Sequence, residues 1–195
     1  SEQPLGRTYE EFARYALHLN DYVQNILDSP IEGVGPLNFR AVLTRDLGFE
    51  KVFNIIYPTS NESFVHVYKG VRDAHGNYKV IEPRLPEELN YLTGMVEQKF
   101  SLAVDEKLAN EIMENREEVL RRIFESTVIP IAGLADVREQ ERTLLVPEEI
   151  YSSLRYEIFT DKAGLGRIDT MMKDPYLEDI SCNGIGSVFV EHKIF

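Results

Sequence analysis

The sequence has one cysteine, no tryptophan and no apolar run long enough to cross a membrane as a helix. The single cysteine, Cys182, excludes an intrachain disulfide framework and any zinc site that needs several cysteines. This cysteine usage makes the cytosol the expected compartment.

Basic residues are few, because 21 Lys and Arg stand against 33 Asp and Glu, giving a net charge of −12. Such a chain repels nucleic acid and anionic membranes at long range, so we expect no nucleic-acid partner. Hydrophobic residues make up 43% of the chain, which is enough to build a sizeable core and excludes wholesale disorder.

The motifs of several enzyme classes are missing. No Gly-Lys pair occurs, so the chain has no phosphate-binding loop, and it has neither an H-E-x-x-H nor a G-x-S-x-G motif. The four histidines are scattered along the chain, and we interpret them as ordinary helix, strand and loop residues. We therefore expect neither a catalytic residue nor a metal site in this chain.

The order of predicted elements indicates an α+β fold with an N-terminal helical element, residues 1–31, and an α+β domain, residues 37–195. Thr8 and Glu11 have the spacing of a capping box that opens a helix through residue 28, and the glycines that follow suggest that this helix is separable. Residues 51–57, 63–69 and 78–83 read as strands of a small antiparallel sheet. Apolar periodicity predicts helices in residues 86–104, in residues 105–125 and after Pro147.

Carboxylates are densest in the segment DPYLED, residues 174–179. They could serve acid–base or cation chemistry. In the alternative interpretation, Asp174 before Pro175 forms a turn, while Glu178 and Asp179 lead into a strand and make polar contacts with a neighbouring domain. No cation is adjacent to Cys182, so we expect a small buried residue rather than a reactive thiolate.

The C-terminal part of the chain resembles a known family. GLGRIDTMMKDPYLEDISCNG at 164–184, followed by VFVEHKIF at 188–195, is similar to the segment that precedes the motor domain in archaeal type II/IV secretion ATPases. This group includes archaellum motor ATPases and archaeal pilus-assembly ATPases. The positions that match the family pattern are Gly164, Gly166, Asp174, Pro175, Leu177, Glu178, Asp179, Ile180, Gly184 and His192.

The resemblance implies an N-terminal domain of a hexameric ATPase whose C-terminal RecA-like motor domain would follow the chain. In that family ATP and magnesium bind between the two domains. The N-terminal domain caps the nucleotide, contacts neighbouring subunits and couples motion to a polytopic membrane platform protein and accessory motor proteins. The implied machine drives archaellum rotation or assembly, pilus assembly or secretion at the cytoplasmic face of the membrane. The chain would then be a fragment that lacks ATPase activity of its own.

Two other functions remain open at this point. The chain could be a stand-alone acidic adaptor domain, or a small enzyme that uses the carboxylates between Asp174 and Asp179.

Overall fold

The computed structural model describes residues 7–104, 106–182, 184 and 187–195 and has an α+β fold, as predicted. The chain forms two compact units. Unit 1 combines the residues up to 82 with residues 170–195, whereas unit 2 is the continuous stretch 83–169. None of the described residues forms a helix that is long and apolar enough to span a membrane.

A four-stranded sheet with the order β1-β2-β3-β4 organises unit 1. Its strands are β1 (Asn38–Phe39), β2 (Phe53–Pro58), β3 (Phe64–Lys69) and β4 (Asn77–Ile81). The antiparallel pairing of β2, β3 and β4 confirms the predicted meander, and the short β1 adds to β2 in parallel. Every residue of β2 is buried, because both faces of the sheet are covered.

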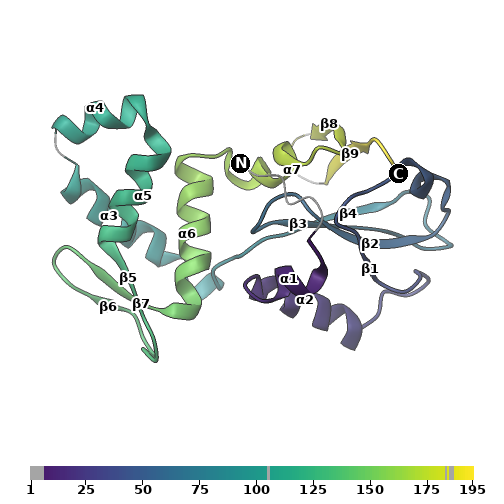
Figure 1. The fold of residues 1–195 in the computed structure, drawn as a ribbon, viewed down its shortest axis with the longest axis horizontal. Coiled ribbons are helices and arrows are strands. Elements are labelled where there is room, and N and C mark those ends of the chain that lie inside the picture. Colours follow the sequence, from purple (N-terminus) through teal and green to yellow (C-terminus); the bar gives the residue numbers. More distant parts are fainter. Residues whose placement is uncertain (1–6, 105, 183, 185–186) are drawn as a thin grey trace. The chain divides into compact units, whose positions relative to one another are not determined.

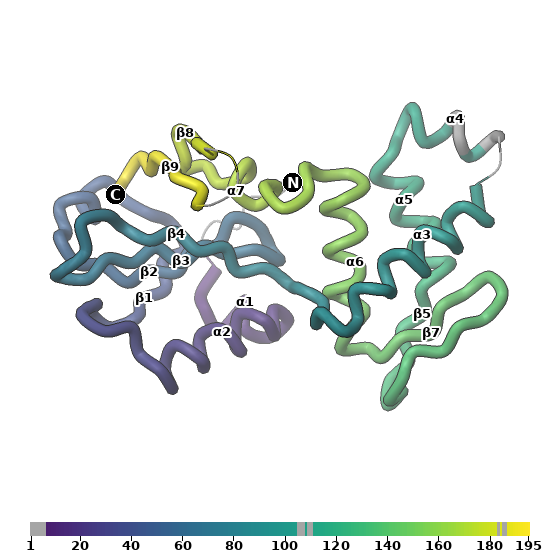
Figure 2. The backbone as a smooth tube through the Cα atoms, turned by 180° about the vertical axis from the view of Figure 1, so that it is seen from behind, coloured from purple at the N-terminus to yellow at the C-terminus, as the bar shows by residue number. Residues whose placement is uncertain are grey.

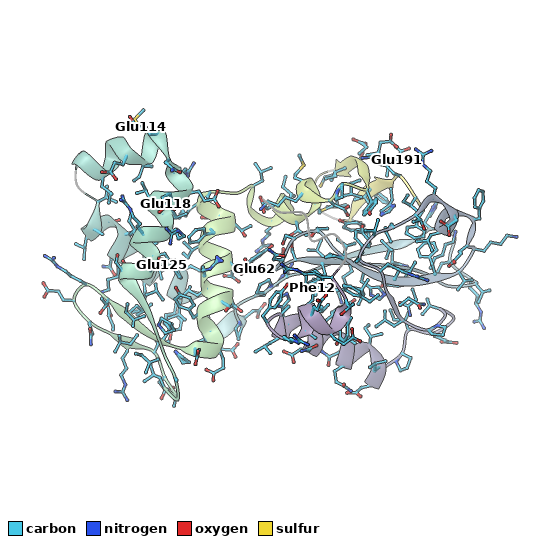
Figure 3. The ribbon with its side chains drawn as sticks, viewed as in Figure 1. Phe12, Glu62, Glu114, Glu118, Glu125 and Glu191 are labelled. Carbon is cyan, nitrogen blue, oxygen red and sulfur yellow. The ribbon has the colours of Figure 1, made fainter. Side chains whose placement is uncertain are left out.

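Two helices, α1 (Tyr9–Ala13) and α2 (Leu17–Asp28), cover one face of this sheet (Figure 1). Phe12, labelled in Figure 3, points from α1 toward the sheet. Phe12 and Leu19 are fully buried against Ile56 and Phe64. The prediction of one uninterrupted helix was wrong. Two helices form because the Asn20 side chain donates to the Ala13 carbonyl at the end of α1, 2.8 Å away.

The C-terminal stretch covers the opposite face of the sheet (Figure 2). It comprises α7 (Asp169–Lys173), β8 (Leu177–Cys182) and β9 (Val188–His192), and β8 and β9 form an antiparallel hairpin. Tyr176, Ile194 and Phe195 pack against the core residues of β2 and β3. Unit 1 is therefore a sheet between an N-terminal helical layer and a C-terminal layer. This grouping differs from the division into residues 1–31 and 37–195 that the sequence suggested.

Unit 2 packs helices against a small sheet with the order β5-β7-β6. Its elements are α3 (Tyr91–Ala103), α4 (Glu106–Glu114), α5 (Arg116–Thr127), β5 (Val128–Ile131), β6 (Arg138–Glu139), β7 (Leu144–Pro147) and α6 (Glu148–Lys162). The helix after Pro147 is confirmed, whereas the predicted helix of residues 105–125 is divided at Asn115. Phe124, Leu144 and Leu154 are fully buried at the centre of unit 2.

A buried lysine holds the β6 hairpin of unit 2. Lys99 is only 6% exposed, and its ammonium group donates to Glu139 Oε1 at 2.7 Å. The same group donates to the carbonyls of Gln140 at 2.8 Å and Glu141 at 3.1 Å. Burial of this cation is tolerated because three acceptors surround it.

We expect Lys99→Met to lower the free energy of unfolding of unit 2 by about 2 kcal/mol, because charge-assisted bonds in a buried site are lost. Hydrogen exchange of unit 2 peptides, read by mass spectrometry, measures this change. The control is Lys162→Met, since Lys162 pairs with Glu97 at the surface and such pairs contribute less than about 1 kcal/mol. Equal effects of the two substitutions would contradict the role given to Lys99.

Candidate functional site

Asp174, a residue of the family-like segment, is buried at the centre of a hydrogen-bond network in unit 1. Its Oδ2 atom accepts the hydroxyl of Tyr57 at 2.6 Å and the hydroxyl of Tyr78 at 2.8 Å. Its Oδ1 atom accepts the backbone N–H of Tyr176 at 2.8 Å. Asp174 is 5% exposed, so these three donors replace water around its carboxylate. Asp174 thereby joins the β8–β9 layer to strands β2 and β4.

His192 extends the network at the end of β9. The backbone N–H groups of Ile194 and Phe195 point at its Nδ1 atom, at 3.2 Å and 3.4 Å. Nδ1 is therefore an acceptor, and in the neutral ring the proton lies on Nε2. Nε2 then donates to the hydroxyl oxygen of Tyr57 at 3.1 Å, and Tyr57 donates in turn to Asp174. The direction of every hydrogen bond in this chain of groups follows from the two backbone donors.

The electrostatics of the site favour these protonation states. Burial, with the nearby Asp174 charge second, raises the pKa values of Tyr57 and Tyr78 well above the usual range, so both hydroxyls keep their protons. Burial lowers the pKa of His192, although Asp174 partly opposes this shift. The ring is therefore neutral near pH 7, as its two backbone donors require.

The predicted turn at Asp174 and Pro175 is confirmed. The Asp174 carboxylate binds the N–H two residues later, and its carbonyl accepts the N–H of Leu177 at 3.3 Å. Lys193 donates to the Pro175 carbonyl at 2.7 Å, which ties the end of β9 to the turn. The turn directs the chain into β8.

Glu178 and Asp179 lie on β8 and are exposed, in contrast to Asp174. The β8–β9 register is irregular between Leu177 and Asp179, so Glu178 has no opposite residue on β9. Asp179 faces Glu191 across the hairpin and accepts the hydroxyl of Ser181 at 2.9 Å. The carboxylates of the DPYLED segment thus divide into one buried group and two exposed groups.

The glycines of the family-like segment have local structural roles. Gly164, in unit 2, ends α6, where an added Cβ would lie 2.6 Å from Asp169 Oδ1 and 2.9 Å from the Thr160 carbonyl. Gly166 and Gly184 both have positive φ values, 63° and 85°. Gly164 and Gly166 belong to unit 2, whereas the other matching positions lie in unit 1.

Cys182 does not have the predicted environment. It is exposed at the end of β8, and its Sγ donates to the Gly184 carbonyl at 3.1 Å. The expectation of a buried thiol was wrong, because among the residues that the structure describes β8 pairs only with β9. The next residue of the predicted strand, Asn183, lies outside the described residues.

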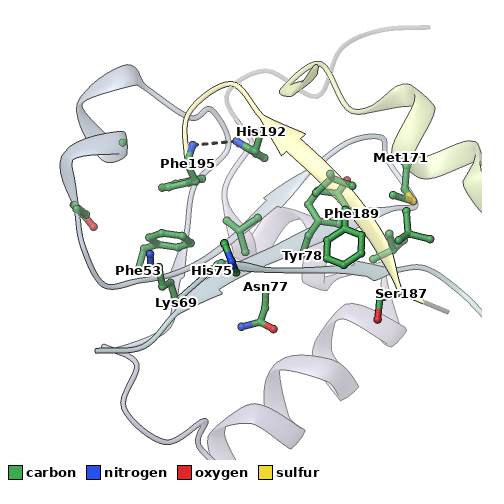
Figure 4. Close-up of a pocket in the computed structure, with 17 residues that line it drawn as sticks. Phe53, Lys69, His75, Asn77, Tyr78, Met171, Ser187, Phe189, His192 and Phe195 are labelled. Atoms are coloured by element: carbon green, nitrogen blue, oxygen red, sulfur yellow. Dashed lines mark hydrogen bonds between the residues drawn. The ribbon is translucent and has the colours of Figure 1, made fainter. Parts of the chain in front are cut away.

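A cavity of about 840 Å³ lies next to the Asp174 network, between the sheet and β9 (Figure 4). Tyr78 and His192 line both the network and the cavity. His192 is among the residues predicted from the sequence, whereas Tyr57 and Tyr78, which lie 117 and 96 residues from Asp174 in the chain, are not. No local sequence pattern predicts hydrogen-bond partners that are so far apart in the chain.

Comparison with known proteins identifies relatives in an archaeon. The chain is 30% identical over 188 residues to the uncharacterized protein MJ0900 of Methanocaldococcus jannaschii, covering 91% of this chain and 33% of MJ0900. It is 32% identical over 121 residues to the uncharacterized protein MJ1288 of the same organism, covering 60% of this chain and 42% of MJ1288. The chain thus spans a third of the first relative and less than half of the second. No protein-family model matches the chain.

Proposed function

We propose that this chain is the N-terminal coupling domain of a hexameric ATPase of the secretion superfamily. The observation that carries the proposal is the position of the family-like segment, whose Asp174, turn and His192 build one covering layer of unit 1. A domain that moves as a rigid body needs such internal connections rather than a catalytic constellation. The archaeal origin of both relatives, and the greater length of MJ0900, fit a chain that works together with a further domain.

The proposal gives the exposed carboxylates of β8 a different role from Asp174. Glu178 is exposed at an irregular point of the strand, and such irregularities redirect side chains. We place Glu178 at the face that meets the motor domain, which binds ATP and magnesium in this proposal. Neighbouring subunits of a hexamer, a membrane platform protein and accessory motor proteins complete the proposed set of partners.

We expect Glu178→Ala to reduce ATP turnover of the natural polypeptide that contains this chain by about fivefold, which corresponds to a loss of about 1 kcal/mol in the transition state. Steady-state phosphate release measures the rate, and the melting temperature of the 195-residue chain should be unchanged. Glu191→Ala is the matched control, because Glu191 is an exposed carboxylate on the partner strand. Wild-type turnover in the Glu178 variant would refute the interdomain role.

The same measurements separate the two other functions. A natural polypeptide without ATPase activity, and without a sixfold assembly in light scattering with ATP, would favour the adaptor. ATP hydrolysis by the 195-residue chain alone, lost in Glu178→Ala or Asp179→Ala, would favour the small enzyme. The buried position of Asp174, whose two oxygens already accept three hydrogen bonds, argues against a shared reaction of the three carboxylates.

A further inference from the structure

The cavity beside the Asp174 network has the size of a small-molecule site, since such sites enclose about 300–1,000 Å³. It lies wholly within unit 1. Phe53 and Tyr78 line it on the sheet, and Phe189 and Phe195 line it from the C-terminal layer (Figure 4). Val67 of β3 also lines the cavity. Its existence does not depend on the proposed ATPase role.

The cavity is partly open to solvent, and its wall has more apolar than polar surface. Phe189 is 63% exposed and Val188 is 44% exposed, although both line the cavity. The rings of Phe53 and Phe195 stack with their centroids 4.2 Å apart. Covering this surface with an apolar body is favourable by about 25 cal/mol per Å² removed from water.

Two polar groups of the wall, Tyr78 and His192, are already satisfied by the protein. The Tyr78 hydroxyl donates to Asp174, and both ring nitrogens of His192 are hydrogen-bonded. Neither group needs an additional partner from a ligand. A ligand therefore needs no polar group opposite Tyr78 or His192, and the aromatic rings around the cavity favour an aromatic body.

One cation at the cavity, Lys69, lacks an anionic partner. Its ammonium group donates to the Ala74 carbonyl at 3.3 Å, and it belongs to no ion pair within the part of the chain that the structure describes. Lys69 follows Val67 on the same face of β3, which places it beside Phe53. Glu50 also lines the cavity, and its negative charge disfavours a ligand with several negative charges.

We propose that this cavity binds a monoanionic amphiphile, with an aromatic body against Phe53, Tyr78 and Phe189 and a single carboxylate or sulfonate at Lys69. The aromatic walls supply most of the affinity, and the lysine selects the charged end. The same arrangement excludes nucleotides from the cavity. A di- or triphosphate requires several cations, and the negative charge of Glu50 would repel it.

Two fluorescent probes with the same aromatic body test the proposal. 8-Anilinonaphthalene-1-sulfonate carries one negative charge, and N-phenyl-1-naphthylamine is its neutral counterpart. We expect one sulfonate probe to bind per folded chain. The buffer should be one in which the protein shows a cooperative unfolding transition, so that the probe reports on the native cavity. Lys69→Gln should weaken binding of the sulfonate about tenfold while changing the affinity for the neutral probe less than about twofold. Phe189→Ala should weaken both probes.

Lys79→Gln is the matched control, because Lys79 neighbours Tyr78 on β4 but lies over the Tyr22 ring, 4.8 Å from its centroid, on the opposite face of the sheet. This variant should bind both probes like the wild type. The proposal is overturned if Lys69→Gln and Lys79→Gln have equal effects on the sulfonate, or if Phe189→Ala changes neither affinity. Displacement of the bound sulfonate by ATP would overturn the monoanionic assignment.

Discussion

Asp174→Ala should lower the free energy of unfolding of unit 1 by about 4 kcal/mol. The substitution leaves two tyrosine hydroxyls and the Tyr176 N–H without their acceptor. Each hydrogen bond to a buried charge contributes on the order of 1.5–3 kcal/mol, and the sum is less than additive because the groups relax together. Urea unfolding followed by tyrosine fluorescence measures the loss.

Two further variants distinguish the effect of losing the hydrogen-bond network from the general effect of removing a carboxylate. Asp174→Asn keeps the shape and one acceptor oxygen, and we expect it to cost about half as much. Asp179→Ala removes an exposed carboxylate five residues along the same segment and should stay within about 0.5 kcal/mol of wild type. If Asp174→Ala also stays within that range, the network does not join the C-terminal layer to the sheet.

The free energy of unfolding should fall by about 3 kcal/mol between pH 7 and pH 4 because of His66 alone. This ring is fully buried on the helix-covered face of the sheet, where its nitrogens contact the Tyr22 hydroxyl at 2.8 Å and Asn54 Oδ1 at 2.6 Å. Asn54 donates its amide to the Gly35 carbonyl, so its Oδ1 accepts from His66 Nε2, and Nδ1 accepts from Tyr22. The folded protein therefore requires a neutral ring.

Burial, followed by the charge of Lys79, lowers the pKa of His66 from 6.5 to about 4. Below pH 6.5 the His66 ring of the unfolded chain is thus protonated, whereas in the folded chain the ring stays neutral down to about pH 4. The stabilisation is present above pH 6.5 and is lost as the pH falls through that window. His18 and His192 also have lowered pKa values and contribute in the same direction.

Comparison with His66→Gln isolates the contribution of His66. Glutamine does not titrate, so the unfolding free energy of this variant should depend less on pH by about 3 kcal/mol over the same range. His75→Gln, at an exposed position, is the control and should keep the wild-type dependence. Parallel curves for wild type and His66→Gln would contradict the assignment.

Strands β2, β3 and β4 could be predicted because their signal is local. Val65 and Val67 alternate with His66 and Tyr68, and a turn with Gly70 and Gly76 separates β3 from β4. The capping box also held, since the Thr8 N–H donates to the Glu11 carboxylate at 2.7 Å. The turn at Asp174 was predictable for the same reason, as its hydrogen bonds reach only a few residues along the chain.

The rest depended on contacts between distant residues. Neither glycine nor proline marks the break between α1 and α2, which is stabilised by the Asn20 side chain after the chain has folded back. Strands β5 and β7 are four residues long and each contains a proline, which is rare inside a sheet, so the sequence predicts no strand there. The sequence could not show that Asp174 accepts hydrogen bonds from two tyrosines. These tyrosines lie on strands far from Asp174 in the chain, and folding of the sheet brings them next to it.

The discontinuous composition of unit 1 has a consequence for biosynthesis. Residues 83–169 leave the ribosome before residues 170–195, so unit 2 is an insertion that can complete its core first. Until β8 and β9 emerge, the sheet face with Phe53, Val65 and Val67 has no cover; at ~5–20 residues per second this lasts roughly ten seconds. The residues that flank the insertion lie next to each other, since Thr170 donates to Glu82 Oε2 at 3.0 Å. The nascent chain therefore carries an exposed apolar sheet face, which is a target for chaperones, until β8 and β9 have been translated.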